Sequence, residues 1–474
     1  MKSGKIIKFL RIFQKPQTLF LIVLFLTSLV LRLYRVSLAP FDHDQQIPAQ
    51  FAYDFFRLHK TSLIGQELSF MGFFLGPLHN TLELIPYGFC KLDPVCVPYF
   101  YTFVGALIII SLYLIVKSVF NKKTAIISSA FFSIAYAAIN HERAINSNFF
   151  LVLSQGLLLY CLHKYFQNKN YYLPLAAFVC GIAVVNFNPV FIFSALTFAA
   201  ISLLRRKKEI YIYAVSAIAF GINYLPLIVF NLRHQNLLLN NFKVFMEKSA
   251  GLPVNLDRIL FVSKDIVLPF YTNFFFQSRQ PFFAIITLLL IIVGAKIVLK
   301  EKNYYLYLPL LIIVTFVSFI FYQGQVSEYY FWPTLLPVVI LVAKTLQKNT
   351  ALLISFLLLF IYSNLNYLYK EESHVNLKIK KEVVSYIEED TSTKSFKLYN
   401  DMPRGLNTGY DYLFKIAKSQ PVPDGENLYI LAFGKPELFY MENYYKTFRN
   451  QDINLKVFGY VEVVSVKNKA NSRP

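Results

Sequence analysis

Long apolar runs recur along most of this sequence. Between Leu19 and Leu368 they are about 15 to 23 residues long, and short basic clusters separate them. An α-helix rises about 1.5 Å per residue and the hydrocarbon core of a bilayer is about 30 Å thick, so these runs match membrane spans. A chain inside lipid must satisfy its own backbone hydrogen bonds, which leaves helices or closed barrels. Because the runs lack strict alternation of apolar and polar residues, they predict helices.

Charged residues are too scarce for a soluble protein. Asp, Glu, Lys and Arg make up 16% of the 474 residues, whereas soluble chains carry about 25%. The chain therefore lacks the polar side chains needed to cover a water-facing surface, and a soluble fold is excluded.

The net charge of +20 comes from 47 basic and 27 acidic residues. A surplus of this size can indicate nucleic-acid binding. Here the basic residues lie between apolar runs, as expected for cytoplasmic loops of a membrane protein. We therefore expect membrane lipids as partners and no nucleic acid. The N-terminus should be cytoplasmic because it holds Lys2, Lys5, Lys8, Arg11 and Lys15.

The runs predict about eleven spans in a multi-pass protein of the plasma membrane. With the N-terminus inside, every short basic connection falls on the cytoplasmic side. The expected spans are 18–36, 99–117, 124–140, 149–163, 171–186, 189–204, 210–230, 281–299, 304–322, 330–346 and 350–368.

The first span follows a basic start, as a signal peptide does. Pro40, directly after the small-residue site at 37–39, disfavours cleavage, so we expect an uncleaved anchor. Arg32 and Arg35 near its end are expected to reach the outer interface.

Three segments are expected on the outer side: the loops 37–98 and 231–280, and the region after 369. In the first loop, 47–60 and an apolar stretch ending at Phe89 predict interfacial helices. The C-terminal region predicts a helix followed by strands, at Val375–Glu389, Ser395–Leu398, Leu428–Phe433 and Leu455–Val466. The predicted fold is an all-α polytopic bundle over 1–369 with a small extracytoplasmic α/β domain over 370–474.

Two carboxylates open the first outer loop. Asp42 and Asp44 flank His43, a pattern that suits either a general base or metal ligation. The same pattern suits a hydrated loop in which Asp42 caps the following helix. The spacing alone leaves these interpretations open.

Further polar residues gather at the outer ends of other spans. They are Arg143, Asn146, Arg233, His234, Glu328 and Tyr329. Each taken singly also fits an interfacial anchor or a helix cap. Together they would bring cations, carboxylates and amides to one face of the bundle, and Arg is a natural partner for phosphate oxygens.

The spans hold almost no ionisable side chains. None occurs in Thr102–Ile115, Ile212–Phe230 or Phe282–Gly294. An ion-coupled transporter would be expected to hold a carboxylate or a Lys near the membrane midplane. We interpret the bundle as a scaffold for the outer loops. Cys90 and Cys96 lie in the first of these loops, where a disulfide is permitted, although spacing does not establish that they pair.

Several short segments carry a family resemblance. They are Leu31–Arg35 with Asp42–Gln45, Gly72–Leu78, Pro226–His234, Tyr329–Pro333 with Pro337, and Tyr399–Asp401 with Gly405–Leu413. These segments resemble the GT-C superfamily of polytopic glycosyltransferases that use lipid-phosphate sugars. The bacterial relatives of protein O-mannosyltransferases and the aminoarabinose transferases are the most similar groups, and the resemblance covers most of the chain.

The resemblance implies transfer of a sugar from a polyprenyl phosphate to a glycan, lipid or protein acceptor on the outer face, with inversion. Asp44 would remove the acceptor proton, with Asp42 as the alternative. Arg143 and Arg233, with His234, would hold the lipid phosphate. The other candidates for the substrate site are Asn146, Glu328 and Tyr329.

The resemblance leaves metal dependence open. The family often has Asp-Glu where this chain has His43-Asp44-Gln45, so a divalent metal, if one is bound, would use Asp42 and Asp44. No other cofactor is expected. Gly-rich phosphate loops are absent, so no nucleotide site is expected either.

Two other classes of function fit a polytopic chain. A lipid or glycan flippase would move its substrate without forming a glycosidic bond. An envelope glycan polymerase or ligase would depend on outer Arg residues and dispense with Asp42 and Asp44. The sequence does not specify the sugar, the acceptor, the length of the lipid carrier or the oligomeric state.

Overall fold

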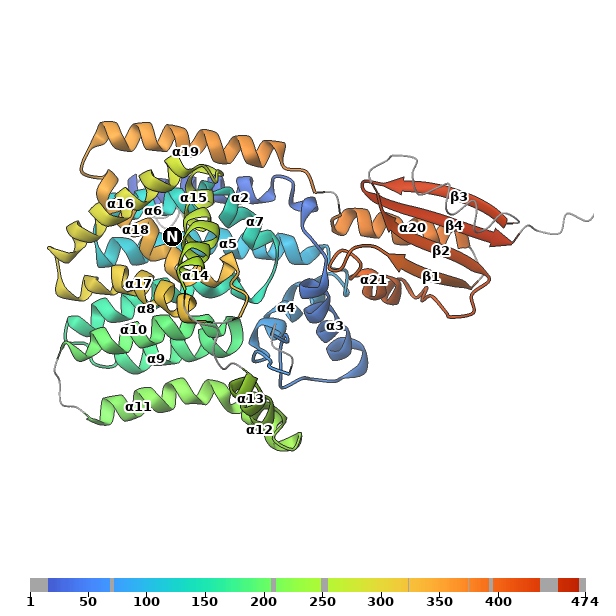
Figure 1. Ribbon diagram of the computed structural model, residues 1–474, viewed down its shortest axis with the longest axis horizontal. Coiled ribbons are helices and arrows are strands. Elements are labelled where there is room, and N and C mark those ends of the chain that lie inside the picture. Colours follow the sequence, from blue (N-terminus) through green and yellow to red (C-terminus); the bar gives the residue numbers. More distant parts are fainter. Residues whose placement is uncertain are drawn as a thin grey trace, which may run out of the picture.

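The computed structural model describes residues 16–68, 72–205, 210–248, 255–322, 324–373, 375–391, 395–434 and 451–468. The basic residues before Pro16 and those at 206–208, on which the predicted orientation partly rests, lie outside the described residues. Within these ranges the chain is mostly helical, with a small sheet near its C-terminus (Figure 1).

The predicted polytopic helical bundle is confirmed. Nine helical segments within the described ranges are long and apolar enough to cross a membrane, and the apolar helices Tyr172–Phe187 and Pro189–Leu203 are shorter. The bundle contains α2 Pro16–Leu33, α5 Cys96–Val119, α6 Lys122–Ile134, α7 Tyr136–Arg143, α8 Leu151–Phe166, α9 Tyr172–Ile182, α10 Ile192–Leu203, α11 Ile210–Gly221, α12 Leu225–Arg233, α16 Pro281–Leu299, α17 Tyr307–Phe321, α18 Trp332–Leu346 and α19 Thr350–Lys370.

Helix α18 is the centre of the bundle. Every side chain from Trp332 to Leu346 is buried, and the helix packs against α16, α17, α8 and α6. Because the core fixes this helix along its whole length, the short helix η8 at Glu328–Phe331, which leads into it, has a defined position at one end of the bundle.

The expected span at 124–140 is interrupted. Helix α6 ends at Ile134, and α7 begins after Ala135, whose ψ of 118° is not helical. Arg32 of α2 donates to the carbonyls of Phe132 and Ser133, which lie at the end of α6. Arg32 is 1% exposed, so the expectation that it reaches the interface is wrong. Freed carbonyls attract the guanidinium into the bundle instead.

The expected outer loop 231–280 is largely helical, with α13 at Leu237–Lys248 and an apolar segment at Leu256–Phe276 that includes α14 Leu256–Leu260 and α15 Leu268–Phe276. Although this segment is long enough to span, both ends lie at one end of the bundle. Arg258 binds carbonyls at the end of α17, and Arg279 pairs with Glu328 before α18. This is the arrangement of a re-entrant segment, and α14 and α15 run across the direction of α19 in Figure 1.

Two helices of the segment 37–98, which was expected as the first outer loop, cover one end of the bundle. They are α3 at His43–Leu58 and α4 at Leu78–Phe89, and they pack against each other. Cys90 and Cys96, between α4 and α5, form a disulfide with Cα atoms 6.0 Å apart.

The C-terminal region lies beyond α3 and α4 (Figure 1). It contains α20 Leu377–Thr391, α21 Tyr410–Ala417 and a sheet in the order β1-β2-β4-β3. The sheet strands are β1 Phe396–Asp401, β2 Asn427–Phe433, β3 Gln451–Phe458 and β4 Val461–Asn468. β1 and β2 are parallel, and the other pairs are antiparallel.

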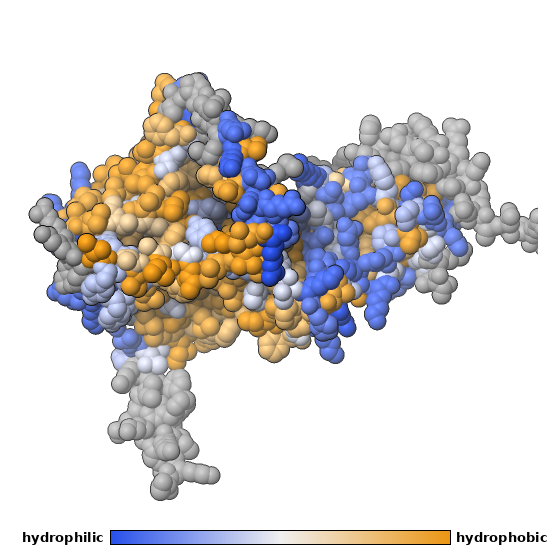
Figure 2. All heavy atoms as spheres, turned by 90° about the horizontal axis from the view of Figure 1, so that it is seen from below, coloured by the Kyte–Doolittle hydropathy of each residue, from blue (hydrophilic) through white to orange (hydrophobic). Residues whose placement is uncertain are grey.

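One strand prediction was wrong. The segment expected as a single strand, Leu455–Val466, is a hairpin, because Gly459 with a φ of 60° turns the chain between β3 and β4. Figure 2 shows that hydrophobic side chains dominate the helical bundle, while hydrophilic side chains gather at its junction with the C-terminal region and over that region.

Candidate functional site

Asp42 and Asp44 lie at the start of α3. Asp42 is the N-cap residue, and its backbone N–H donates to the Gln45 side chain at 2.9 Å in a capping box. This arrangement satisfies two backbone donors that a helix start would otherwise leave free. The cap fixes the direction in which the first turn, with Asp44, leaves the bundle.

The two carboxylates have different environments. Asp42 accepts a 2.7 Å bond from Lys380 of α20, a side chain that is completely buried. Asp44 has no ion-pair partner within the described ranges and accepts a 2.6 Å hydrogen bond from Nε2 of Gln66. Asp42 is therefore committed to a structural contact, whereas Asp44 keeps a carboxylate able to take a proton.

The Asp44 side chain is exposed to solvent at the start of α3. Partial burial raises the pKa of its carboxyl above the ordinary value, the Asp42 charge adds to this rise, and His43, His79 and the Gln66 hydrogen bond oppose it. A raised pKa makes the ionised carboxylate a stronger base.

A buried polar cluster lies on α4 and α5 near Asp44. His79 and Glu83, one helical turn apart, approach to 3.1 Å, and Tyr101 donates to Glu83 at 3.3 Å. Burial raises the pKa of Glu83. Oδ1 of Asn80 and Oε2 of Glu83 are buried without a hydrogen-bond partner among the described residues. The cluster has room for further polar partners, such as buried water.

Helix α7 sends three consecutive side chains in different directions. Glu142 forms an ion pair with Arg32 of α2, in which Nη2 of Arg32 donates to Oε1 of Glu142 at 2.8 Å. Arg143 forms an ion pair of 2.7 Å with Glu371, which follows α19. His141 stacks on Trp332 of α18, with ring centroids 3.8 Å apart. The two ion pairs tie α7 to the first and last helices of the bundle.

The predicted residues Arg143 and Asn146 both make structural contacts within the protein. The Arg143 side chain, 2% exposed, points to Glu371 and the carbonyl of Tyr34. The Asn146 side chain caps η2 (Ser147–Phe150) by accepting from the N–H of Asn148. Nevertheless, their loop adjoins Asp44, because Gln45 donates to the carbonyl of Ala144.

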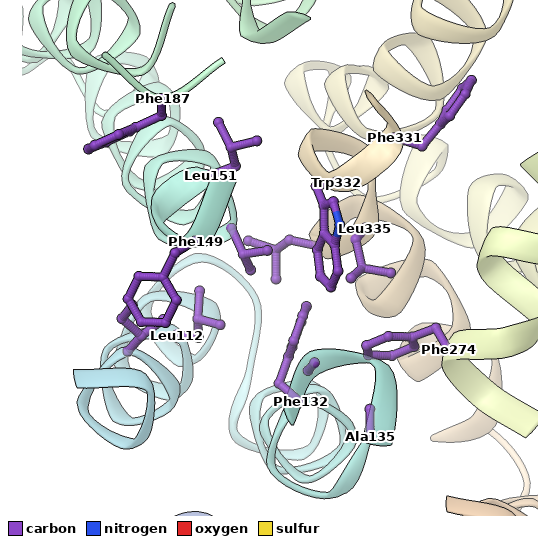
Figure 3. Close-up of a cluster of buried hydrophobic side chains, with 14 of the residues drawn as sticks. Leu112, Phe132, Ala135, Phe149, Leu151, Phe187, Phe274, Phe331, Trp332 and Leu335 are labelled. Carbon is purple, nitrogen blue, oxygen red and sulfur yellow. The ribbon is translucent and has the colours of Figure 1, made fainter. Parts of the chain in front are cut away.

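A polar cavity of about 580 Å³ opens between α7, α15 and η8. Its lining includes Asn140, His141, Ala144, Asn273, Gln277, Arg279, Glu328, Tyr329 and Trp332. Arg279 and Glu328 form an exposed ion pair of 3.1 Å at the cavity. Trp332 and Leu335 extend from α18 toward Phe132 in a buried hydrophobic cluster, which gives this end of α18 a rigid base (Figure 3).

An apolar cavity of about 320 Å³ adjoins the polar one. Its lining includes Leu68, Phe73, Val190, Phe193, Phe319 and Tyr330. Tyr329 lines both cavities, so the two meet at this side chain. Leu68 belongs to the same loop as Gln66, the partner of Asp44. A polar chamber beside an apolar one can receive an amphiphile with its head and its tail in different places.

Arg233 and His234 lie at the end of α12. Both side chains are exposed, and His234 stacks on Phe230. The contacts of the described residues do not join Arg233 to Asp44 directly. The loop that carries Gln66 does reach α12, since Phe74 and Phe230 are in ring contact at 6.0 Å.

The described residues include no group of three or more His, Cys, Asp or Glu side chains that could hold a metal ion. At the position left open for a metal, Asp42 is paired with Lys380.

In a comparison with protein families, residues 95–228 match the family described as dolichyl-phosphate-mannose-protein mannosyltransferase. No functionally curated protein matches the chain significantly.

Solved structures with the same architecture include ArnT from Cupriavidus metallidurans in the apo state, with a TM-score of 0.63 and 11% identity over 95% of this chain and 98% of that one. The same protein bound to undecaprenyl phosphate gives 0.58 and 11%, over 96% and 99%. An oligosaccharyltransferase from Archaeoglobus fulgidus, tethered to an acceptor peptide, gives 0.50 and 15%, over 86% and 64%.

At these identities the likeness concerns the fold. The chain has the fold of ArnT over nearly its whole length, including the C-terminal region. The predicted resemblance to the GT-C superfamily is confirmed.

Proposed function

Because the chain has the GT-C fold, we propose that it is a glycosyltransferase that moves a sugar from a polyprenyl phosphate to an acceptor on the extracytoplasmic face, with inversion. The observation that carries this proposal is Asp44. Among the described residues its carboxylate has no ion-pair partner, its pKa is raised, and it lies at the start of α3 close to the loops that line a polar and an apolar cavity.

In the proposed reaction, Asp44 takes the proton of the acceptor hydroxyl as the acceptor oxygen attacks the anomeric carbon. The bond from that carbon to the phosphate oxygen breaks, and polyprenyl phosphate leaves with the electron pair. Attack opposite the leaving group inverts the anomeric configuration. A positioned base contributes about 10²- to 10⁴-fold in rate.

The two cavities suit a lipid-linked donor. We assign the apolar cavity to the first part of the lipid chain and the polar cavity, with Glu328 and Tyr329, to the sugar and phosphate. The relative ArnT was solved with undecaprenyl phosphate bound, which supports a ligand of this class.

A departing phosphate needs cations, and the candidates differ in availability. Arg233 and His234 are exposed, although His234 is held against Phe230, and Arg279 lines the polar cavity. Arg143 is tied to Glu371, so we now propose that it, together with Asn146, shapes the cavity wall at α7. In this view Arg279 is the cation that lines the cavity assigned to the phosphate, and Arg233 is the exposed candidate predicted from sequence.

The decisive comparison is made in cells of the native host. Envelope glycans, glycolipids and glycoproteins are compared by mass spectrometry with the gene, without it, and with Asp44→Asn. Asp54→Asn, on the same helix, is the matched control. We expect a glycosylated product that disappears with the gene and with Asp44→Asn only. A flippase would form no new glycosidic bond. A polymerase or ligase would still form its product with Asp44→Asn.

A further inference from the structure

The buried side chain of Lys380 on α20 has one hydrogen-bond acceptor for each proton of its ammonium group. Its ammonium group has three protons, and it has three oxygen acceptors: Oδ1 of Asp42 at 2.7 Å, the carbonyl of Phe41 at 2.9 Å and the carbonyl of Thr408 at 2.8 Å. The Tyr410 ring lies 5.4 Å from the ammonium. A Lys is rarely buried unless it is paired in this way.

The contact belongs to a wider junction between the C-terminal region and the start of α3. The backbone N–H of Gly409 donates to Gln46 at 2.6 Å, and that of Leu377 donates to the carbonyl of Ala39 at 3.0 Å. Gly409 has a φ of 92°, and a Cβ atom there would lie 2.3 Å from the carbonyl of Phe41. The segment from Ala39 to Gln46 is therefore held from the C-terminal side.

Asp42 and Asp44 are two residues apart at one helix end, so their negative charges repel. Lys380 places a positive charge on Asp42 but makes no contact with Asp44. The other groups that act on Asp44 are His43 beside it, His79 from α4 and Gln66 from the loop. Lys380 therefore offsets part of the nearest negative charge that acts on Asp44.

We infer that Lys380 is a positioning residue of the transferase: by pairing with Asp42 it fixes the start of α3 and leaves Asp44 as the single uncompensated carboxylate there. This inference rests on the proposed role of Asp44 as the base. It gives the C-terminal region a part in the reaction, because that region supplies the compensating charge from more than 300 positions along the chain.

The charge state of Lys380 depends on the same pair. Burial lowers the pKa of its ammonium, and Asp42 raises it. Removing Lys380 alone leaves Asp42 as an uncompensated neighbour of Asp44. Removing both charges together, as in Lys380→Met with Asp42→Asn, eliminates that neighbour as well. The double variant should therefore restore the protonation of Asp44 that the single variant changes.

The test follows the protonation of Asp44 directly and does not require transfer activity. Infrared difference spectra of the carboxyl C=O stretch are recorded on the full-length protein in lipid during a pH titration, and Asp44→Asn identifies the Asp44 band. The variants are Lys380→Met and the double variant Lys380→Met with Asp42→Asn. Lys378→Met is the control. Lys378 is exposed on the same helix and pairs only loosely with Glu382, at 3.7 Å.

We expect the Asp44 midpoint to rise by about one pH unit in Lys380→Met, as for a like charge a few ångströms away. It should return to the wild-type value in the double variant and stay there in Lys378→Met. An unchanged midpoint in Lys380→Met, or a rise that the double variant retains, overturns the inference and leaves the proposed function standing. Full product formation by Asp44→Asn in cells overturns the proposed function instead.

Discussion

Nε2 of Gln66 lies 2.6 Å from a carboxylate oxygen of Asp44, and it is the side-chain donor that the described structure gives to the proposed base. An amide orients a carboxylate without neutralising it. The loop that carries Gln66 also lines the apolar cavity through Leu68 and Phe73. Orientation of the base and binding of the lipid are therefore coupled through one loop.

Replacing Gln66 by Leu should lower the transfer rate constant by about tenfold, because the carboxylate loses its orienting donor. The same hydrogen bond lowers the pKa of Asp44, so the acid limb of the pH–rate profile should also move to higher pH. Gln50→Leu, on α3, serves as the control. A profile for Gln66→Leu that overlays the wild-type profile would show that the contact has no part in the reaction.

The pH dependence of transfer follows from the raised pKa of Asp44. A base must be ionised, so activity is full above its pKa and is lost as the pH falls through it. The loss should therefore begin at a higher pH than for an ordinary Asp carboxyl, whose pKa is about 3.9. Product formation in membrane vesicles over a pH series measures this. A rate that stays constant down to about pH 4 contradicts the assignment.

Narrowing the apolar cavity should weaken lipid binding. Val190 lines this cavity of about 320 Å³, and Val190→Trp would fill much of it. We expect at least a tenfold loss of affinity for undecaprenyl phosphate, measured by native mass spectrometry or thermal-shift titration. Leu196→Trp, on the exposed face of α10, places the same side chain outside the cavity. Equal affinities in the two variants would place the lipid elsewhere.

Substitutions of Arg143 and Arg233 should have different effects: the first should lower the melting temperature, and the second should lower the affinity for undecaprenyl phosphate. Arg143→Met strands Glu371, so the melting temperature should fall, by an amount equivalent to about 3 kcal/mol for a broken buried pair. Arg143→Met with Glu371→Gln should recover part of that loss. Arg233→Ala should leave the melting temperature unchanged and lower the affinity for undecaprenyl phosphate. Loss of lipid affinity in a stable Arg143→Met protein would return the phosphate site to α7.

The membrane helices could be predicted from sequence because hydropathy and length act locally. The interruption at Ala135 could not, because it is stabilised by Arg32 from about a hundred positions away. The apolar segment Leu256–Phe276 was also hidden within an expected loop. Its route depends on contacts of Arg258 and Arg279 with the connection between α17 and α18.

The candidate site divides in the same way. A carboxylate after the first span could be found from the sequence, since Asp42 and Asp44 follow shortly after the first apolar run. Which of the two carboxylates forms an ion pair depends on Lys380. The ion pair of Arg143 likewise depends on Glu371, 228 positions away. No local pattern reports such partners. Lys380 also lies in a charged amphipathic helix, where a Lys ordinarily signals an exposed surface.

The central claim is that Asp44 acts as the base in sugar transfer from a polyprenyl phosphate donor. The most direct measurement uses purified protein in liposomes with lipid-linked sugars and acceptor extracted from host membranes, and it follows release of polyprenyl phosphate together with the new glycosidic bond. The wild type should release both products in equal amounts, and Asp44→Asn should release neither while Asp54→Asn remains active. Equal release by Asp44→Asn and the wild type would contradict the account.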